Sequence, residues 1–587
     1  MKIKSSRINI YETLGLLNFL KTFIFSNQVY YSNISFFTRL FLNIFKIDIR
    51  DSASILSYGA ISSSNGIRKF SYQSAIQSLD ELQVDRLNFG LWYAAGIRDG
   101  IIIRKFIFEY IFKKFEFYSI VNQFYKENQS EDIKLRIEHH LINEKSVFGK
   151  NVVYTRTLTF HRIDFFVSIL FLPVFLLIFF LKNRSSKNVE LSNSVVCEVD
   201  SVKIFEMFND IFKEISNVNF FVQKTYRNFF DSSFFVNDKH FTHGLNIKNF
   251  YTFIRLIRSL FKYIYKNCFF VSRFGTSIFN LYKTIANGFL LTPSAMKSIY
   301  FTFEHMSTSK AVRNELLRAS GNLSVFVPYN AYAIDHFFVP EFMYNYDILC
   351  SPGKLLEKVY FMQKALTKTI LPTGSYHPNK KKQFSDGYIE RIESLKKQKG
   401  NNIAITILSN GIQDETLIWE KKMMSLAREL ARIDKLTIFI RQKPVTPHRK
   451  YLDFFQQEKC EIESIILTHS EYELFDFLDV TDLFLTTSSS SAVDLCIAGG
   501  QFYSIDFTEE KDLYLWQTEV DGVYIGENLA KSRILQWITN HNNEQTLHKK
   551  RMDELKKILN YTFNDFEAYK ANLLMQLNPY FVKIAND

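Results

Sequence analysis

Small hydroxyl side chains gather between two apolar runs near residue 487 of this 587-residue chain. The segment "LFLTTSSSSAVDLCIAG" carries Thr487, then four serines that include Ser489 and Ser490, and then an apolar helix-like run. Serine hydroxyls and free backbone N–H groups at a helix N-terminus bind anions, and the helix dipole favours negative charge there. The pattern predicts a phosphate-binding loop. Simple N-capping of the helix is the alternative explanation.

Two more loops with useful side chains follow apolar runs in the same part of the chain. "KLTIFIRQKP" ends at Arg441 and Lys443, and "NNIAITILSNG" ends in a small-residue loop that contains Asn410. Arginine offers a phosphate a bidentate fork, and lysine offers a point charge. Loops that follow neighbouring parallel strands meet at one edge of the sheet. We therefore expect these loops and the serine run to form one nucleotide-phosphate site.

Alternating strands and helices must position these loops. One series of strand candidates runs from "SVVCEV" through "SIYFTFEH" and "GNLSVFVPY" to "YDILCSPGK", and a second begins at Asn401. Such alternation implies βαβ units and parallel sheets. The Pro- and Lys-rich stretch from Lys368 separates the two series. The sequence predicts an α/β fold with two facing Rossmann-like domains, residues 191–375 and 376–587, the second ending in a helical tail.

The first 190 residues differ from the rest of the chain in composition and in hydrophobic pattern. Residues 1–160 are rich in Phe and Ile, and we expect a mainly helical accessory region there. Residues 161–190 contain Phe165–Leu181, an uncharged apolar run with basic flanks, at the lower edge of the length that spans a bilayer. We favour a segment buried in the membrane interface, or a re-entrant one. A true span and a buried core helix are the alternatives.

A basic amphipathic helix is predicted from Tyr251, where Arg255, Arg258, Lys262 and Lys266 share one helical face. A helix lying on a membrane has this pattern, and so does an ordinary surface helix. The formal net charge of the chain is +12, without a compact Lys/Arg block, which favours a membrane surface or small anions over nucleic acid. The five cysteines lack CxxC or metal-site spacing, so we expect reduced thiols in the cytoplasm and no structural metal.

The stretch "TDLFLTTSSSSAVDLCIAGGQFYSID" resembles a motif near the C-terminal end of GT-B-fold glycosyltransferases that build bacterial surface polysaccharides. Relatives in that superfamily include capsule Kdo transferases, polysialyltransferases and CDP-glycerol glycerophosphotransferases. On this resemblance Asp482 opens the motif, and Ser489 and Ser490 face the nucleotide phosphates. Asp494 takes the acidic position, which in the family contacts the ribose or steadies the loop.

Two other stretches carry the resemblance with departures. "IFIRQKP" is similar to the family's strand followed by K/R-x-H-P, but Lys443 replaces the histidine, and His448 lies nearby. "SIYFTFEHMSTSKAVRNELLRASGNLSVFVPYNAY" is similar to a stretch of the family's N-terminal domain, in which Glu304 matches a glutamate. The family's closing Q-H-G is replaced by "PYNAY", which contains Asn330. "YDILCSPGK" matches a family turn in which Asp347 and Gly353 are structural.

The acceptor hydroxyl needs a base if transfer inverts the sugar configuration. Glu304 is our candidate catalytic base, followed by His305 and Asp335. A helix-capping or salt-bridged carboxylate is an equally good explanation for Glu304. No DxD pair stands in a convincing loop, so we expect neither a metal nor a cofactor.

The resemblance implies a metal-independent glycosyltransferase of capsule or lipopolysaccharide biosynthesis. Its partners would be a nucleotide-sugar, with CMP- or CDP-linked donors favoured over UDP, and a saccharide or lipid-linked acceptor. We expect it at the inner face of the bacterial cytoplasmic membrane. A polyol-phosphate transferase of the CDP-glycerol type and a catalytically inactive scaffold in an assembly complex are the alternatives. A GT-B-fold epimerase fits less well, because such enzymes do not need membrane features.

Overall fold

The structure is a computed structural model of the chain, and most of what it describes lies between residues 191 and 586. Before residue 191 it describes short strands, one long helix and a few single residues, and between 223 and 294 only short pieces. The main described stretches are 191–222, 295–303, 308–328, 345–351, 369–374, 387–412, 417–443, 446–469, 471–487, 491–507, 520–559 and 566–586.

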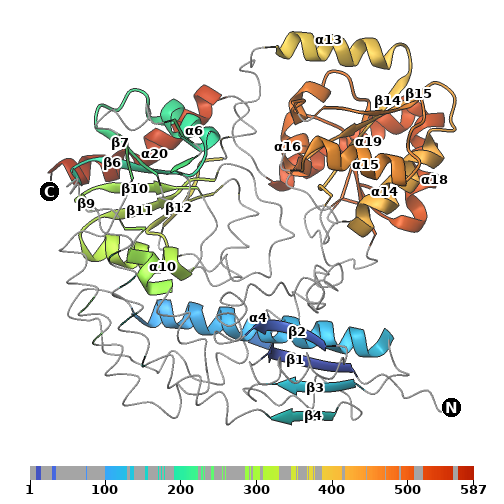
Figure 1. Cartoon of the computed structure of the whole chain (residues 1–587). Helices are drawn as coiled ribbons and strands as arrows, with labels where there is room; N and C mark the ends of the chain where they lie inside the picture. Colours follow the sequence, from blue (N-terminus) through green and yellow to red (C-terminus); the bar gives the residue numbers. More distant parts are fainter. Residues whose placement is uncertain are drawn as a thin grey trace, which may run out of the picture.

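The first α/β unit is built on a seven-stranded sheet in the order β13-β12-β11-β10-β6-β7-β8, with every neighbouring pair parallel (Figure 1). The chain adds β7 and β8 on one side of β6 and then β10 to β13 on the other. The strand order therefore reverses between β6 and β10. The strands are β6 (Val195–Val199), β7 (Val218–Val222), β8 (His240–Thr242), β10 (Ile299–Thr302), β11 (Leu323–Phe326), β12 (Ile348–Ser351) and β13 (Thr369–Pro372).

Helices cover both faces of this first sheet. On one face Cys197 and Phe301 pack against Phe208 of α6, and on the other Tyr300 packs against Leu317 of α10. Burial on both faces explains why the strand sequences are near-continuous apolar runs. The flanking helices are α6 (Val202–Phe212), α10 (Thr308–Ala319) and α20 (Phe566–Asn586).

The second α/β unit has a six-stranded parallel sheet in the order β16-β15-β14-β17-β18-β19. Here the order reverses between β14 and β17, because β15 and β16 extend one side of β14 and β17 to β19 extend the other. The strands are β14 (Ile403–Leu408), β15 (Leu436–Arg441), β16 (Ile465–Leu467), β17 (Leu483–Thr486), β18 (Phe502–Asp506) and β19 (Tyr524–Gly526).

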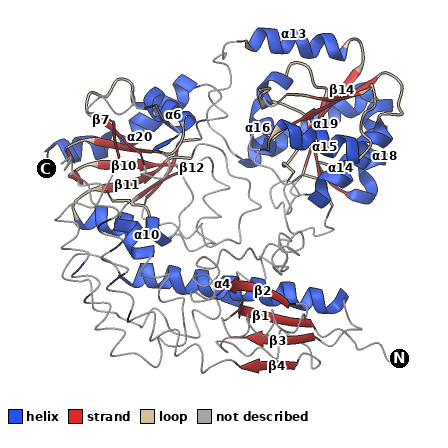
Figure 2. Ribbon diagram, in the orientation of Figure 1, coloured by secondary structure: helices blue, strands red, loops and turns tan. Residues whose placement is uncertain are grey.

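Alternating strand residues divide the core of the second unit into two layers. Ile405, Ile438 and Leu483 face α14, α15 and α18, while Phe439 and Phe484 face α13, α16 and α19. Figure 2 shows these helices around the red strands. The helices are α13 (Tyr388–Lys399), α14 (Leu417–Leu430), α15 (His448–Gln457), the 3-10 helix η10 (Leu474–Phe477), α16 (Ser491–Ala498), α18 (Glu527–Thr539) and α19 (His541–Leu559). The predicted α/β class with two parallel sheets is confirmed.

The last helix returns to the first unit. Phe566, Tyr569, Leu573 and Leu577 of α20 join the core on the α6 face of the first sheet (Figure 1). Lys570 also forms an ion pair of 2.8 Å with Glu214. The sequence groups this tail with the second domain, because a contact between distant segments leaves no local pattern.

The described part of the accessory region contains a sheet that the sequence does not predict. Four strands form a parallel sheet in the order β2-β1-β3-β4, beside one 29-residue helix. The expectation of a mainly helical region is therefore corrected to mixed α/β for the described residues. The elements are β1 (Ile8–Leu14), β2 (Val29–Ile34), α4 (Asp99–Glu127), β3 (Ile133–Ile137) and β4 (Val153–Arg156); β5 (Leu191–Ser192) and β9 (Ala295–Met296) pair separately.

Four residues of the apolar run Phe165–Leu181 are described, and all four are helical. Leu170, Val174, Ile178 and Leu181 are 74%, 52%, 58% and 61% exposed. Their spacing puts them on one helical face, and the other residues of the run lie outside the described residues. Among the described residues, no helix has the length and apolar character needed to cross a membrane.

Candidate functional site

The three loops that the sequence singles out in the second unit lie together at the reversal of strand order. β14 is hydrogen-bonded to both β15 and β17, so the loops after these strands share one edge of the sheet. The Asn410 side-chain amide, after β14, donates to the Thr487 hydroxyl, after β17. Ligands of open α/β sheets bind at this kind of position, outside the carboxyl ends of the strands.

Gly411 allows the loop after β14 to approach the loop after β15. Its φ is +94°, in the left-handed region. A Cβ added there would lie 2.9 Å from Thr446 Oγ1 and 3.2 Å from Lys443 Cδ. A side chain at this position would therefore push the two loops apart.

A buried carboxyl group lies behind the Ser409–Gly411 loop. Glu420 of α14 accepts hydrogen bonds from the Ser409 hydroxyl (2.9 Å) and the Asn410 backbone N–H (2.6 Å). Tyr451 of α15 continues the chain of contacts, because its hydroxyl lies 2.7 Å from Ser409 Oγ and accepts from the Lys443 backbone N–H at 2.9 Å. Glu420 is only 3% exposed and Tyr451 only 1%.

Burial raises the pKa of Glu420 to about 7, even though the Asn410 N–H, the Ser409 hydroxyl and the charge of Lys443 all lower it. Burial likewise raises the pKa of Tyr451. Sequence reasoning missed both residues, because each is one polar side chain on an amphipathic helix. No local signal marks either of them.

Arg441 ends β15 and is largely buried. Burial lowers its pKa, while the nearby charges of Glu473, Asp494 and Asp476 favour its charged form. Its Nε is buried and has no hydrogen-bond partner within the described part of the chain. Lys443, two residues on, is exposed. The site thus offers one partly buried and one solvent-facing positive charge.

The serine run ends, as predicted, at the start of a helix. Thr487 is 5% exposed, and its backbone oxygen accepts from the hydroxyls of Thr486 (3.1 Å) and Ser504 (3.4 Å). Helix α16 begins at Ser491 and carries Asp494, 4% exposed, in its first turn. Ser489 and Ser490 lie outside the described residues. Their assignment to the phosphates stays a prediction.

Asp482 holds the opposite end of β17 in place. Its Oδ2 accepts from Lys399 Nζ at 2.7 Å and from the Ala404 backbone N–H at 2.8 Å. These contacts join α13 and β14 to the start of β17. Asp482 therefore holds β17 in place at its start, and Thr487 follows the other end of the same strand.

His448 begins α15 beside the same edge. Its Nδ1 lies 2.7 Å from Gln442 Nε2, and its ring centroid lies 4.9 Å from that of His469. Gln442 is fully buried directly between Arg441 and Lys443 in sequence. His448 thus contacts the loop that carries Arg441 and Lys443. In the K/R-x-H-P motif that this stretch resembles, the histidine stands at the position of Lys443.

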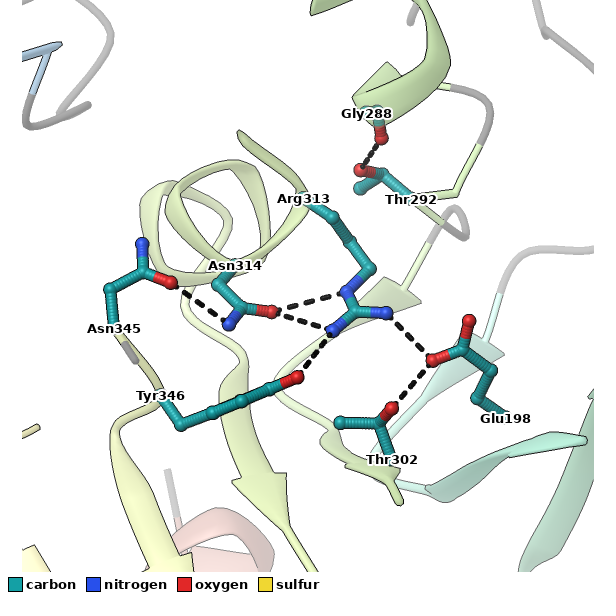
Figure 3. Close-up of polar contacts among 8 residues, drawn as sticks. All are labelled: Glu198, Gly288, Thr292, Thr302, Arg313, Asn314, Asn345 and Tyr346. Atoms are coloured by element: carbon teal, nitrogen blue, oxygen red, sulfur yellow. Dashed lines mark hydrogen bonds and ion pairs between the residues drawn. The ribbon is translucent and has the colours of Figure 1, made fainter. Parts of the chain in front are cut away.

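The reversal point of the first sheet holds a buried ion pair (Figure 3). Arg313 of α10 and Glu198 of β6 are both fully buried, with Nη1 and Oε2 2.7 Å apart. The Thr302 hydroxyl at the end of β10 donates to the same Glu198 oxygen at 2.7 Å. Arg313 also donates to Asn314 Oδ1, and its guanidinium lies 4.9 Å from the centre of the Tyr300 ring. This cluster ties α10 to the two central strands.

Lys310 lies one turn before Arg313 and is 6% exposed. Burial lowers its pKa to about 8, against the charges of Glu198 and Asp200, which raise it. Glu304, the candidate base, follows Thr302 by two residues and lies outside the described residues, as do His305, Asn330 and Asp335.

Asp347 and Gly353 lie in structural turns. Asp347 Oδ2 accepts from both the backbone N–H (2.9 Å) and the hydroxyl (2.8 Å) of Ser324. Gly353 exchanges hydrogen bonds with the Ser351 hydroxyl at the end of β12. Within the described ranges, no group of three or more His, Cys, Asp or Glu side chains is arranged to hold a metal ion.

Comparisons with known proteins give distant similarity to solved structures. No protein-family model and no curated protein matches the chain significantly. A UDP-N-acetylglucosamine 2-epimerase is 11% identical, with a TM-score of 0.40 over 66% of this chain and 97% of the other. The trehalose 6-phosphate synthase of Burkholderia multivorans is 11% identical, with a TM-score of 0.40 over 67% and 98%. The wall teichoic acid polymerase TagF is 10% identical, with a TM-score of 0.39 over 73% and 99%. Similarity at this level identifies neither a family nor an activity.

Proposed function

We propose that this chain is a GT-B-type glycosyltransferase that moves a sugar from a nucleotide-sugar donor to a saccharide or lipid-linked acceptor of a bacterial surface polysaccharide. The observation that carries the proposal is the meeting of three strand-end loops at the reversal point of the second sheet. Asn410, after β14, joins Thr487, after β17, and Arg441 and Lys443 lie at the end of β15, which pairs with β14 on its other side.

The site has the groups that glycosyl transfer from a nucleotide requires. Negative charge develops on the departing phosphate, and preorganised donors and cations that face it lower the barrier. Arg441 and Lys443 supply the full charges, and Thr487, Ser489 and Ser490 supply hydroxyls at the start of α16. Asp494 in the first turn of that helix is assigned to the ribose or to the loop. The sequence motif favours a CMP- or CDP-linked donor.

The acceptor is assigned to the carboxyl edge of the first sheet, with Glu304 as the base that takes the proton of the acceptor hydroxyl. A lipid-linked acceptor calls for a protein at the membrane surface. The exposed row of Leu170, Val174, Ile178 and Leu181 supports this location, because it offers an apolar helical face. We place the protein at the inner face of the bacterial cytoplasmic membrane.

Nucleotide binding is the experiment that tests the function. A ligand that binds only the folded protein raises its stability by about 2.7 kcal/mol at a concentration of 100 times Kd. Thermal unfolding with CMP, CDP, UDP and GDP should show stabilisation, strongest with the cytidine nucleotides. Ser489→Ala combined with Ser490→Ala should remove most of it, whereas Ser532→Ala on α18 should not. A protein that none of the four nucleotides stabilises would fit the inactive scaffold.

Membrane binding is tested separately. Vesicles that contain anionic lipids should carry the wild-type protein upward in a density gradient, and Leu170→Ser with Val174→Ser should weaken this flotation. Leu529→Ser on α18 is the matched control, because Leu529 is 57% exposed on a different element. Equal flotation of all three proteins would remove the apolar face from the proposal.

A further inference from the structure

Glu420 is the buried carboxyl group that faces the back of the candidate phosphate site. It fastens the loop after β14 through Ser409 and Asn410, and Asn410 in turn reaches Thr487 in the serine loop. Through Ser409 it is also connected to Tyr451, which binds the backbone of Lys443. One carboxyl group is thus connected, directly or through one or two side chains, to all three loops of the site.

We propose that Glu420 is a positioning residue that works as a neutral carboxylic acid, holding the Ser409–Gly411 loop against Thr487 and keeping negative charge away from the bound phosphate. This inference rests on the proposed function. It adds a residue that touches no substrate and acts through Ser409 and Asn410.

The hydrogen-bond distances around Glu420 are compatible with the neutral acid. The Asn410 N–H donates to Oε1 at 2.6 Å, and the 2.9 Å between Oε2 and Ser409 Oγ also fits an acid O–H that donates to the serine. Ser409 Oγ further accepts from the Gly411 N–H at 3.0 Å. The serine can then donate to the Tyr451 hydroxyl at 2.7 Å. Ionisation of Glu420 would reverse this chain, with tyrosine donating to serine and serine to the carboxylate.

Burial keeps the neutral form of Glu420 populated near neutral pH. Burial raises its pKa to about 7, and within the described part of the chain the charged or titratable groups that face it are Lys443, from the loop after β15, and Tyr451, from α15. The adjacent lysines on its own helix are engaged elsewhere. Lys421 lies 3.9 Å from Glu458, and Lys422 lies 2.5 Å from Glu527.

A phosphate bound in front of this loop should disfavour ionisation of Glu420, because like charges repel. By linkage, phosphate affinity should then fall as pH rises through about 7. A coupling of one pKa unit corresponds to an affinity loss on the order of tenfold. The terminal phosphate of CDP also titrates, near pH 6, but that contribution is common to every protein variant.

The test is the affinity for CDP between pH 6 and pH 8.5, measured by titration calorimetry on the full chain. Glu420→Gln imitates the neutral acid, since its oxygen can accept from Asn410 and its NH2 can donate to Ser409. We expect wild-type affinity to fall roughly tenfold more than that of Glu420→Gln over this range. Glu429→Gln is the matched control on the same helix. It removes an exposed carboxylate that pairs with Lys531, and it should follow the wild type.

The possible outcomes separate the two proposals. If CDP binds and the curves of wild type and Glu420→Gln are parallel, the inference on Glu420 is wrong and the proposed function stands. If neither CDP nor any of the other three nucleotides binds the wild type, the proposed function is wrong and the inference falls with it. If Glu420→Gln does not fold, NMR titration of carboxyl-labelled glutamates in the wild type decides. The inference is supported if one glutamate signal titrates near pH 7 and every other folded glutamate variant retains that signal. It is overturned if no glutamate signal titrates above about pH 6.

Discussion

The Asn410 side chain donates a hydrogen bond to Thr487, and it thereby joins the two strands between which the second sheet reverses its strand order. The first sheet has the same arrangement, with Thr302 donating to Glu198 across its own reversal point at 2.7 Å. Both contacts lie at carboxyl ends of central strands. In the second sheet the contact belongs to the candidate phosphate site, and in the first it belongs to a buried ion-pair cluster.

Asn410→Ala should weaken nucleotide binding. The substitution removes the link to Thr487 and lets the two loops separate, at a cost of about 1 kcal/mol, or roughly fivefold in affinity. Titration calorimetry with CDP measures this. Asn572→Ala is the control, since Asn572 is partly exposed on α20 and bonds only to Pro372 O and Gln576 in the described contacts. Unchanged affinity in Asn410→Ala would show that the link does not shape the site.

Arg313→Met should destabilise the first unit strongly. It leaves Glu198 buried without its cation, and breaking a buried pair from one side costs about 3–5 kcal/mol. Adding Glu198→Gln should recover part of the loss, because no unpaired charge then remains. Urea unfolding measures the free energy of unfolding of the single and of the double variant. Lys531→Met, which removes an exposed ion pair with Glu429, should have little effect. Equal losses in Arg313→Met and Lys531→Met would contradict the assignment of a buried, structural pair.

His548 should make the fold acid-sensitive. Burial lowers its pKa to about 4 from an unfolded value of about 6.5. Between these values the unfolded chain binds more protons, so the free energy of unfolding falls as pH drops, by up to roughly 3 kcal/mol below pH 4. His548→Gln should flatten this dependence in unfolding experiments from pH 7 to pH 4. His469→Gln, at an exposed position, should retain the wild-type slope. A slope unchanged in His548→Gln would count against the buried neutral histidine.

Leu573→Ala should reveal the return of α20 to the first sheet. Leu573 is fully buried in the core of that unit, and removing such a side chain costs about 2–5 kcal/mol. Met575 on the same helix is 68% exposed, and Met575→Ala should leave the unfolding midpoint nearly unchanged. If both substitutions have the same small effect, α20 does not pack on this sheet in solution.

The strands of the site could be predicted because their signals are local. "IAITIL" and "LFLT" are apolar runs, and burial on both sheet faces requires such runs, so β14, β17 and a helix directly after the serine run followed from the residues. Glu420 could not be found in this way. It is a glutamate on an amphipathic helix like its neighbour Lys421, and only the tertiary fold separates the buried side chain from the exposed one.

Long-range packing explains the other differences. Arg313 belongs to a helix whose sequence favours a solvated charged face, yet Glu198 of a distant strand neutralises it inside the protein. The tail that contains Leu573 is separated by the whole second unit from the sheet that it covers. Strand β1, "INIYETL", mixes polar and apolar residues too evenly to indicate a parallel sheet. Glu304, Ser489 and Ser490 lie outside the described residues and stay predictions.

The most direct test of the account is thermal unfolding of the wild type and of Arg441→Met, each with and without CDP. Arg441 is the partly buried cation at the edge where the three loops meet, so we predict that CDP raises the unfolding temperature of the wild type and not that of Arg441→Met. Arg432→Met, which changes an exposed arginine after α14, should respond to CDP like the wild type. An equal rise in all three proteins, or no rise in the wild type with any of the four nucleotides, would contradict a nucleotide-phosphate site at this edge.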